Sequence, residues 1–354
     1  MRIPKFLEKG GTIGFIAPSF GCNMEPYKSA FENAQKKFDS MGYKLSLGPN
    51  CYAGEGVGIS NTPEKCGAEM NEYLANKKVD AIISCGGGEL MCETLDYADF
   101  KGMAEAEPTW YMGYSDNTNL TFLLPTLCDT AAIYAPCVNS FGMEPWHQSI
   151  TDAFDILTGE TDAVKGYDMW EKESLKDEEH PFEPYNLTEK RILKSFNANG
   201  KKDENIKGAD LGADVELSGR MIGGCMDCLA NLVGTKFDKV KAFNERYRDD
   251  GIIWFMEACE LNPMSIRRAL WQLKHAGWFE HLKGFLIGRP LCYGEEQFDM
   301  STYQAVTAAL GDFGVPIIMD LDIGHLSPMM PVISGSMSEV KAHGNDIEIR
   351  YLFK

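Results

Sequence analysis

The sequence predicts an α/β protein, with a mostly parallel sheet in its first half and a mixed α/β domain in its second half. Two observations support this prediction. Between residues 12 and 135, short apolar runs alternate with amphipathic helical patterns, which is typical of strands joined by helices on both faces of a sheet. The chain also has 354 residues, more than one hydrophobic core usually supports, so we expect two domains.

The elements of the first half follow in order from their apolar patterns. Residues 12–18 predict a buried strand that ends in a loop, and the helical spacing from Tyr27 to Met41 predicts a helix that Gly42 ends. Further strands are expected at 43–47, 80–85, 109–114 and 131–135, and helices at 63–77, 89–99 and 118–127. We therefore expect a Rossmann-like domain over residues 1–160. Because active sites of such sheets lie beyond the carboxyl ends of the strands, the loops 17–24, 85–89 and 113–118 are the places to search.

Residues 161–212 are polar and lack clear periodicity, so we expect a connecting segment rather than a third domain. The charge run at 171–179 predicts a solvated face. Trp170, just before it, is more typical of a local packing anchor than of a substrate contact. The second domain is expected over 213–354, with strands at 252–256, 285–288 and 315–321, a helix at 265–275 and a hairpin at 339–352 that turns near Gly344.

Composition and charge exclude several classes of protein. The formal charge of −18 argues against nucleic-acid binding, which requires a basic surface. No apolar run is long enough to span a bilayer, and the N-terminus has no export signal, so we expect a cytoplasmic protein without a membrane partner. The eleven cysteines are expected to be reduced. The only CxxC, Cys225–Cys228, lacks a second ligand pair, so packing of a helix start is favoured over a metal site.

Ser115 lies in a predicted tight turn between a strand and a helix. This context exposes a hydroxyl at the edge of a sheet, beside backbone N–H groups that favour negative charge. The competing interpretation is that Ser115 or Asp116 only caps the helix. The hydrolase elbow Gly-x-Ser-x-Gly is not matched, because Asn117 stands in the place of its last glycine.

Three further segments could complete acyl-transfer chemistry. The glycines at 86–88 follow a strand and could offer backbone N–H groups to an oxyanion; a phosphate loop is the alternative, but its motifs are absent. Glu257 ends an apolar strand, where a carboxylate could orient a histidine or simply be exposed. Among the six histidines, His325 closely follows an apolar strand and could act as the base, although this segment alone favours a surface histidine in a Pro-rich loop.

At these residues the sequence resembles the LD-carboxypeptidase family of serine peptidases, which includes the microcin C immunity peptidases. The resemblance extends over nearly the whole chain. It rests on six motifs in a fixed order, namely Gly11–Ser19, Gly86-Gly87 with Leu95-Asp96, Gly113–Thr118, Gly219–Gly224, Glu257 with Ile266–Leu270, and Gly324-His325.

The resemblance implies a Ser115–Glu257–His325 triad in an active site between the two domains, with oxyanion contacts from Gly87 and Asp116. It also implies a homodimer and neither metal nor cofactor. The expected substrate is a small L,D-linked murein peptide or an aminoacyl- or peptidyl-nucleotide conjugate. The alternative is a non-catalytic nucleotide- or peptide-binding protein.

Two departures bear on the substrate. Cys225 follows Gly224 where family members often carry Asn, and the 160–212 stretch is longer than in the murein-recycling members. The longer stretch resembles the microcin-immunity branch, in which a loop tryptophan stacks on a nucleobase. Trp170 is the candidate here for that substrate-binding role.

Overall fold

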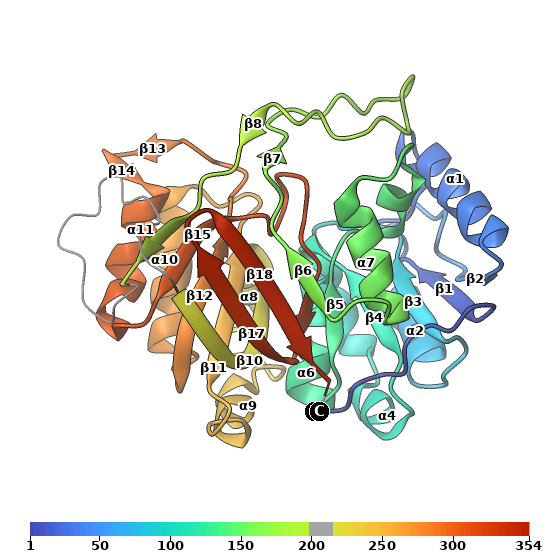
Figure 1. Cartoon of the computed structure of the whole chain (residues 1–354). Helices are drawn as coiled ribbons and strands as arrows, with labels where there is room; N and C mark the ends of the chain where they lie inside the picture. Colours follow the sequence, from blue (N-terminus) through green and yellow to red (C-terminus); the bar gives the residue numbers. More distant parts are fainter. Residues whose placement is uncertain (198–214, 354) are drawn as a thin grey trace. The chain divides into compact units, whose positions relative to one another are not determined.

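The computed structural model describes residues 1–197 and 215–353 (Figure 1). These residues form two compact units. The first comprises Met1–Asp162, Glu173–Asn186 and Pro331–Gly335; the second comprises Ala163–Lys172, Leu187–Met330 and Ser336–Lys354, as far as they are described. Residues 198–212 of the predicted connecting segment lie outside the described part.

The first unit is built on a six-stranded sheet with the order β16-β5-β4-β3-β1-β2. Strands β2, β1, β3, β4 and β5 are parallel, and β16 pairs antiparallel with β5 at the edge. The strands are β1 (Thr12–Ile16), β2 (Lys44–Leu47), β3 (Ala81–Ser84), β4 (Trp110–Gly113), β5 (Ala132–Tyr134) and β16 (Val332–Ser334). The prediction of a mostly parallel sheet is thus confirmed, and strand order reverses between β1 and β3, which makes their carboxyl ends the expected site of binding.

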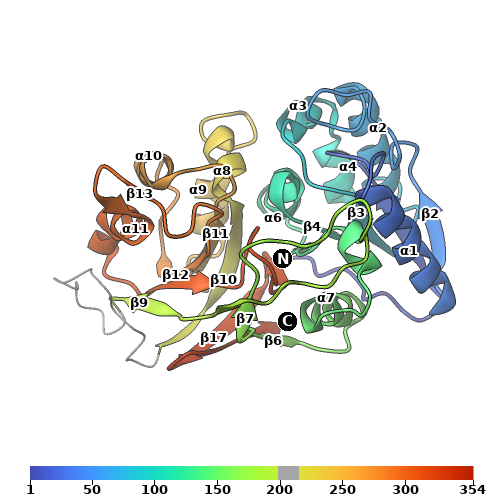
Figure 2. The same cartoon turned by 90° about the horizontal axis from the view of Figure 1, so that it is seen from above.

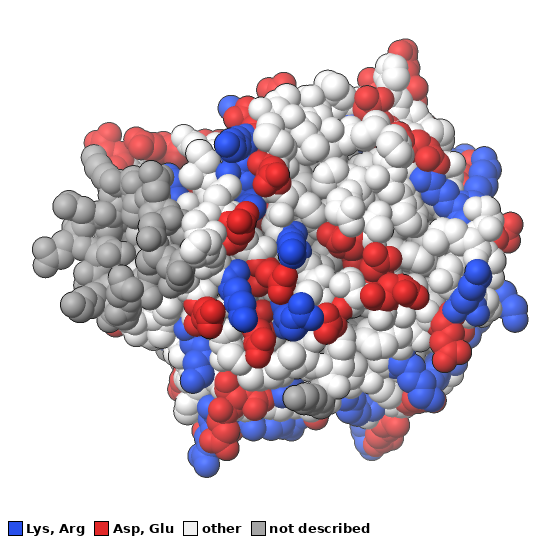
Figure 3. All heavy atoms as spheres, viewed as in Figure 1, with Lys and Arg blue, Asp and Glu red and all other residues white. Residues whose placement is uncertain are grey.

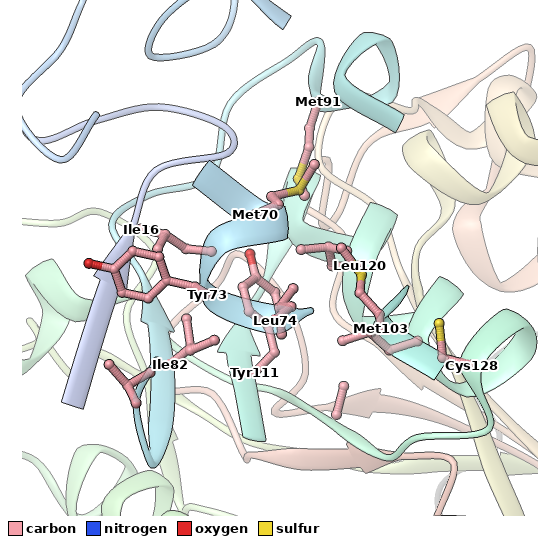
Figure 4. Close-up of a cluster of buried hydrophobic side chains, with 13 residues drawn as sticks. Ile16, Met70, Tyr73, Leu74, Ile82, Met91, Met103, Tyr111, Leu120 and Cys128 are labelled. Atoms are coloured by element: carbon pink, nitrogen blue, oxygen red, sulfur yellow. The ribbon is translucent and has the colours of Figure 1, made fainter. Parts of the chain in front are cut away.

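Helices cover both faces of this sheet because neighbouring side chains of a strand point to opposite faces. On one face, Phe15 packs against Phe31 and Phe38 of α1 (Tyr27–Ser40), and Phe38 also contacts Phe154 of α7 (Gln148–Thr158). On the other face, Ile16 joins a buried cluster with Met70, Tyr73 and other residues shown in Figure 4. That cluster draws on α2 (Pro63–Leu74), α3 (Met91–Thr94), α4 (Phe100–Glu105), α5 (Thr118–Thr121) and α6 (Leu123–Cys128).

Two predicted helices are divided. The stretch 118–127 consists of α5 and α6, which meet at Phe122. Pro125 has no N–H to donate to the carbonyl of Thr121, so one continuous helix would lose a hydrogen bond at this point. The stretch 89–99 contains only the four residues of α3, followed by a short 3₁₀ turn, η1 (Leu95–Tyr97).

The second unit contains an eight-stranded mixed sheet with the order β6-β18-β17-β10-β11-β12-β15-β9. Strands β10, β11, β12 and β15 are parallel, and the others pair antiparallel. The bounds are β6 (Ala163–Lys165), β9 (Lys194–Phe196), β10 (Val215–Cys225), β11 (Ile252–Glu257), β12 (Leu282–Gly288), β15 (Ile317–Leu321), β17 (Met337–His343) and β18 (Asp346–Leu352). The predicted mixed domain and its hairpin of β17 and β18 are confirmed.

Within its described residues, this unit has four α-helices: α8 (Met226–Leu232), α9 (Val240–Arg246), α10 (Pro263–His275) and α11 (Thr302–Leu310). Helix α10 packs against both α8 and α11, and the three lie on the same side of β11 and β12 (Figure 2). Cys225 ends β10 and directly precedes α8, so the CxxC segment marks a helix start, as predicted. No helix within the described residues is long and apolar enough to cross a membrane.

The segment around Trp170 is a short two-stranded ribbon of β7 (Met169–Trp170) and β8 (Glu189–Lys190). The charge run that follows is mostly exposed, as predicted, except that its first residue, Glu171, is buried. On the face of the molecule shown in Figure 3, acidic and basic side chains are interspersed rather than gathered by sign.

Candidate active site

Ser115 follows β4 at the carboxyl edge of the first sheet. Its φ is +62°, in the left-handed region that non-glycine residues rarely adopt, and its side chain is partly exposed. The Ser115 N–H donates to the hydroxyl of Tyr134 in the neighbouring strand β5, at 3.1 Å. A strained backbone conformation costs free energy and persists only where surrounding contacts hold it. Such residues cluster at active sites and other functional positions.

The residue after Ser115 connects three loops of the first unit. The Asp116 side chain is buried, and its Oδ2 accepts hydrogen bonds from Ser19 Oγ at 2.6 Å and from the Met91 N–H at 2.9 Å. The N-cap positions of the 3₁₀ turn η2 (Ser115–Asn117) and of α5 are Tyr114 and Asn117, and neither side chain makes a capping hydrogen bond. The interpretation of Ser115 or Asp116 as a simple helix cap is therefore not supported.

The glycine loop lies directly against Ser115. The Gly86 carbonyl accepts from the Asn117 amide at 2.8 Å, and the Gly87 carbonyl accepts from the Phe20 N–H at 2.8 Å. A Cβ added to Gly87 would lie 3.0 Å from Ser115 Cβ and 3.1 Å from its Oγ. Only a residue without a side chain allows the backbone to approach the serine this closely.

A cavity of about 480 Å³ adjoins this loop within the first unit. Its walls come from the loops after β1, β2, β3, β4 and β5, around the point where strand order reverses. Aromatic rings are supplied by Phe20, Tyr27 and Tyr114, and polar groups by Asn23 and Asn139. None of the described residues that line it carries a charged side chain. Such a cavity suits an uncharged, partly apolar group.

Glu257 and His325 are joined in the second unit. Glu257 ends β11 with its side chain fully buried, and its Oε2 lies 2.8 Å from His325 Nδ1. The turn that carries His325 passes closely over this carboxylate. Gly324 has a φ of +111°, and a Cβ there would lie 2.6 Å from Glu257 Oε2.

The charge of the pair favours a protonated histidine. Burial opposes protonation of His325, but the Glu257 carboxylate, together with the nearby Cys259 thiol, more than offsets this effect. The pKa of His325 consequently lies well above its ordinary value of 6.5.

A polar support holds the end of β11. The Asp227 carboxylate, in the first turn of α8, accepts the N–H groups of Cys259 at 3.1 Å and Glu260 at 2.9 Å. Cys225, which stands where family members often have Asn, is opposite Glu257 in the parallel register and donates its thiol to Asp227 at 3.2 Å. Its contact with Cys228 and its burial hold the pKa of Cys225 well above the usual range, so this thiol stays neutral.

The structure thus brings together Ser115, Gly87 and Asp116 in the first unit, and Glu257 and His325 in the second. Trp170 lies in the second unit with 3% of its surface exposed. Its ring packs against Tyr293, with centroids 5.1 Å apart, and against the Arg289 guanidinium at 5.0 Å. This packing matches the anchor interpretation, whereas a substrate contact by Trp170 stays a prediction.

Sequence reasoning missed two residues that position the serine turn, Ser19 and Tyr134. Ser19 follows the first predicted strand in a loop already marked for search, so its position was a usable signal. The sequence around Tyr134 contains no such signal, because its hydroxyl contacts a backbone N–H group, which every residue except proline carries. Among the described residues, no group of three or more His, Cys, Asp or Glu side chains is arranged to hold a metal ion.

Comparison with known proteins gives a consistent result for both units. Residues 13–135 match the family model of the LD-carboxypeptidase N-terminal domain, and residues 218–340 match that of the LD-carboxypeptidase C-terminal domain. Together the two models span most of the chain and include Ser115, Glu257 and His325.

Individual relatives are distant but aligned along most of their length. The microcin C7 self-immunity protein MccF of Escherichia coli is 25% identical over 350 residues, 97% of this chain and 94% of that protein. A probable murein peptide carboxypeptidase of Bacillus subtilis is 22% identical over 336 residues, 94% of this chain and 89% of that protein. A solved structure of MccF in complex with glutamyl sulfamoyl guanosine has a TM-score of 0.77 and 20% identity, and covers 99% of this chain and 98% of that one, which shows a common fold.

Proposed function

The chain belongs to the LD-carboxypeptidase family and is a serine peptidase, and on this premise we propose that Ser115, His325 and Glu257 hydrolyse an amide bond through an acyl-enzyme. The observation that carries the proposal is the hydrogen-bonded Glu257–His325 pair, in combination with a serine held in a strained turn against a glycine loop. A nucleophile, a base and a group that orients the base are the parts that this chemistry requires.

In the first half-reaction, Ser115 Oγ attacks the carbonyl carbon while His325 Nε2 takes the hydroxyl proton. In the neutral imidazole, Nδ1 carries the proton and donates it to the Glu257 carboxylate. Nε2 is then the nitrogen available to act as base. The mechanism requires Nε2 to come within hydrogen-bond distance of Ser115 Oγ. Collapse of the tetrahedral intermediate breaks the C–N bond, and the imidazolium returns its proton to the leaving nitrogen.

In the second half-reaction, water attacks the acyl-serine with His325 again as base, and the carboxylic acid product leaves. We assign the oxyanion contacts to the backbone N–H groups of Gly87 and Asp116. For Gly87 this assignment is supported by the Gly86 carbonyl, which accepts the Asn117 amide and thereby orients the peptide group that carries the Gly87 N–H. Fixed donors aimed at a developing negative charge are among the largest contributions to acyl-transfer catalysis.

For the substrate, we propose an aminoacyl- or peptidyl-nucleotide conjugate, with an L,D-linked murein peptide as the second candidate. Support comes from the uncharged, partly aromatic cavity beside the glycine loop, which suits a flat neutral group better than the carboxylates of a peptide stem. The MccF complex with glutamyl sulfamoyl guanosine and the similarity to a probable murein peptide carboxypeptidase keep both classes in view.

The proposal is tested by direct hydrolysis. Wild type and the variants Ser115→Ala, Glu257→Ala and His325→Ala are incubated with glutamyl sulfamoyl guanosine and with a murein tetrapeptide, and product release is measured by chromatography. Exposed residues provide matched controls in Ser40→Ala and His343→Ala. We expect turnover of the nucleotide conjugate by wild type and both controls, and its loss in all three site variants.

The two parts of the proposal can fail separately. Full activity of Ser115→Ala would contradict the triad. Exclusive turnover of the murein peptide would contradict the substrate preference but not the chemistry. The homodimer and the cytoplasmic location are further proposals, the first of which light scattering on the purified protein would test.

A further inference from the structure

A second cavity, of about 400 Å³, lies in the second unit and is separate from the proposed catalytic residues. Its walls come from β9 (labelled in Figure 2), the segment after β12, the start of α11 and the end of β15 (Figure 1). The side chains that matter here are Lys194, Tyr293, Tyr303 and Asp320, with Glu295 and Glu296 exposed at its surface. Neither Glu257 nor His325 lines it.

Asp320 is placed in this wall by an irregularity in β15. In the pairing of β12 with β15, Ile287 is opposite Met319 and Gly288 is opposite Leu321, so Asp320 is left over as a bulged residue. Its φ is +65°, in the left-handed region, and only 3% of its surface is exposed. Bulges of this kind redirect a side chain, and strained residues of this kind gather at ligand sites.

The Asp320 carboxylate is incompletely satisfied by the protein. Its Oδ2 accepts one hydrogen bond, from Tyr303 Oη at 2.6 Å, and within the described residues its Oδ1 accepts none. Arg289 contributes no hydrogen bond to the carboxylate, because Nη1 donates to the Asp320 backbone carbonyl and Nη2 to Asp322. The free acceptor position of Oδ1 lies at the wall of the cavity, where a donor from water or from a cationic ligand can complete it.

A positive charge lines the same cavity without neutralising Asp320 directly. The Lys194 ammonium lies 4.0 Å from the centre of the Tyr303 ring, and in the described part of the chain no ion pair joins it to Asp320. The cavity therefore presents a carboxylate and an ammonium, each in contact with Tyr303. Glu295 and Glu296 add negative charge at its mouth, which attracts a cationic group.

We propose that this cavity binds an amino acid in its zwitterionic form, with the ligand's ammonium group on Asp320 and its carboxylate on Lys194. Tyr293 would contact the ligand's side chain. The volume is in the range of small-molecule sites and exceeds what a single amino acid requires, so longer side chains or a dipeptide can also be accommodated. The proposal does not depend on the peptidase activity.

The test uses the full chain and three probes of nearly equal size: L-alanine, propionate, which lacks the ammonium group, and ethylamine, which lacks the carboxylate. Binding is measured by saturation-transfer NMR and by calorimetry at millimolar concentrations. We expect L-alanine to bind at least about tenfold more tightly than either analogue, since each loses one charged contact. A failure of L-alanine to bind, or equal binding of either analogue, would overturn the proposal.

Variants then assign the two contacts. Asp320→Asn and Lys194→Met are each expected to weaken L-alanine binding by about tenfold or more, whereas Lys190→Met, an exposed lysine of β8, should leave it unchanged. Because Lys194 is only half-buried, we expect Lys194→Met to fold normally. It therefore still tests the site if Asp320→Asn impairs folding. Wild-type affinity in a folded Lys194→Met protein would overturn the assignment of the carboxylate contact.

Discussion

Glu257 Oε2 lies 2.8 Å from His325 Nδ1, and the carboxylate that makes this contact is fully buried. Burial of a charge is tolerated here because the imidazole provides a partner, and the turn at Gly324 closes over the pair. This relationship fixes both the orientation and the charge of the histidine.

The first prediction concerns the charge of Glu257. Glu257→Gln keeps the shape of the side chain but removes its charge. Either the carbonyl oxygen or the NH₂ group of the amide can then face His325. We expect kcat/KM to fall by roughly 10³-fold or more, because the imidazole is held in the wrong tautomer. NMR titration should show that the pKa of His325 falls toward its ordinary value. A His325 pKa that does not move would contradict the direct coupling of the two residues.

The second prediction concerns pH. A base must be neutral to accept a proton, and the pKa of His325 is raised well above 6.5. We therefore expect kcat/KM to rise with pH through that raised pKa, so that the acidic limb of the profile lies above pH 6.5. The free energy of unfolding depends on pH in the opposite direction. The stabilisation by the ion pair is complete below the pKa that His325 has in the unfolded chain, and it is lost as pH rises through the pKa that His325 has in the folded protein. An acidic limb centred below pH 6.5 would contradict the raised pKa.

The third prediction concerns the close approach of Gly87 to Ser115. Gly87→Ala would place a methyl group 3.1 Å from Ser115 Oγ and displace either the serine or the oxyanion donor. We expect kcat to fall by roughly 10²-fold, the typical effect of a displacement of about 1 Å in a catalytic site. Gly311→Ala is the control, because a Cβ there meets nothing within 4 Å. Equal activity of the two variants would show that the glycine loop does not shape the site.

The fourth prediction concerns stability and Glu69, whose side chain supports the loop that carries Ser19. Glu69 is buried and accepts the N–H groups of Ala17 and Asn50, both at 2.9 Å. Burial raises its pKa from 4.5 to about 7 against the effect of these hydrogen bonds. The folded state therefore binds more protons between these values, and the free energy of unfolding should fall by up to about 3 kcal/mol as pH rises from 4.5 to 7.

Denaturant titrations at several pH values check this dependence. In Glu69→Gln the contribution of this residue to the pH dependence should disappear, whereas in Glu64→Gln, an exposed residue of the same helix, it should persist. An unchanged slope in Glu69→Gln would mean that another group titrates in this range.

Much of the fold could be predicted because its strands are short apolar runs bounded by loop residues, and the five parallel strands of the first unit were all located this way. The longest strand, β10, was missed because Gly219, Gly223 and Gly224 interrupt its apolar pattern. Strands β6, β7, β8 and β9 were missed because each has only two or three residues and pairs across a long sequence separation.

The candidate site could be predicted only in part from local sequence. The turn at Ser115 was visible in the strand–turn–helix pattern, but its left-handed φ and its contacts with the Tyr134 hydroxyl and the glycine loop were not. Nothing near Glu257 in sequence distinguishes it from an exposed strand-end acid, because the turn that passes over its carboxylate is at Gly324, 67 positions later in the chain. The bulge that turns Asp320 toward a cavity likewise follows from pairing with β12 rather than from its own neighbours.

The proposed mechanism depends most directly on Ser115 as the nucleophile. The decisive measurement is intact-protein mass spectrometry after acid quenching of a reaction with glutamyl sulfamoyl guanosine, followed by localisation of any added mass. We predict that wild type carries the acyl group on Ser115 and that Ser115→Ala carries none and turns over at least about 10³-fold more slowly. Turnover by Ser115→Ala at the wild-type rate would contradict the role of Ser115 as the nucleophile.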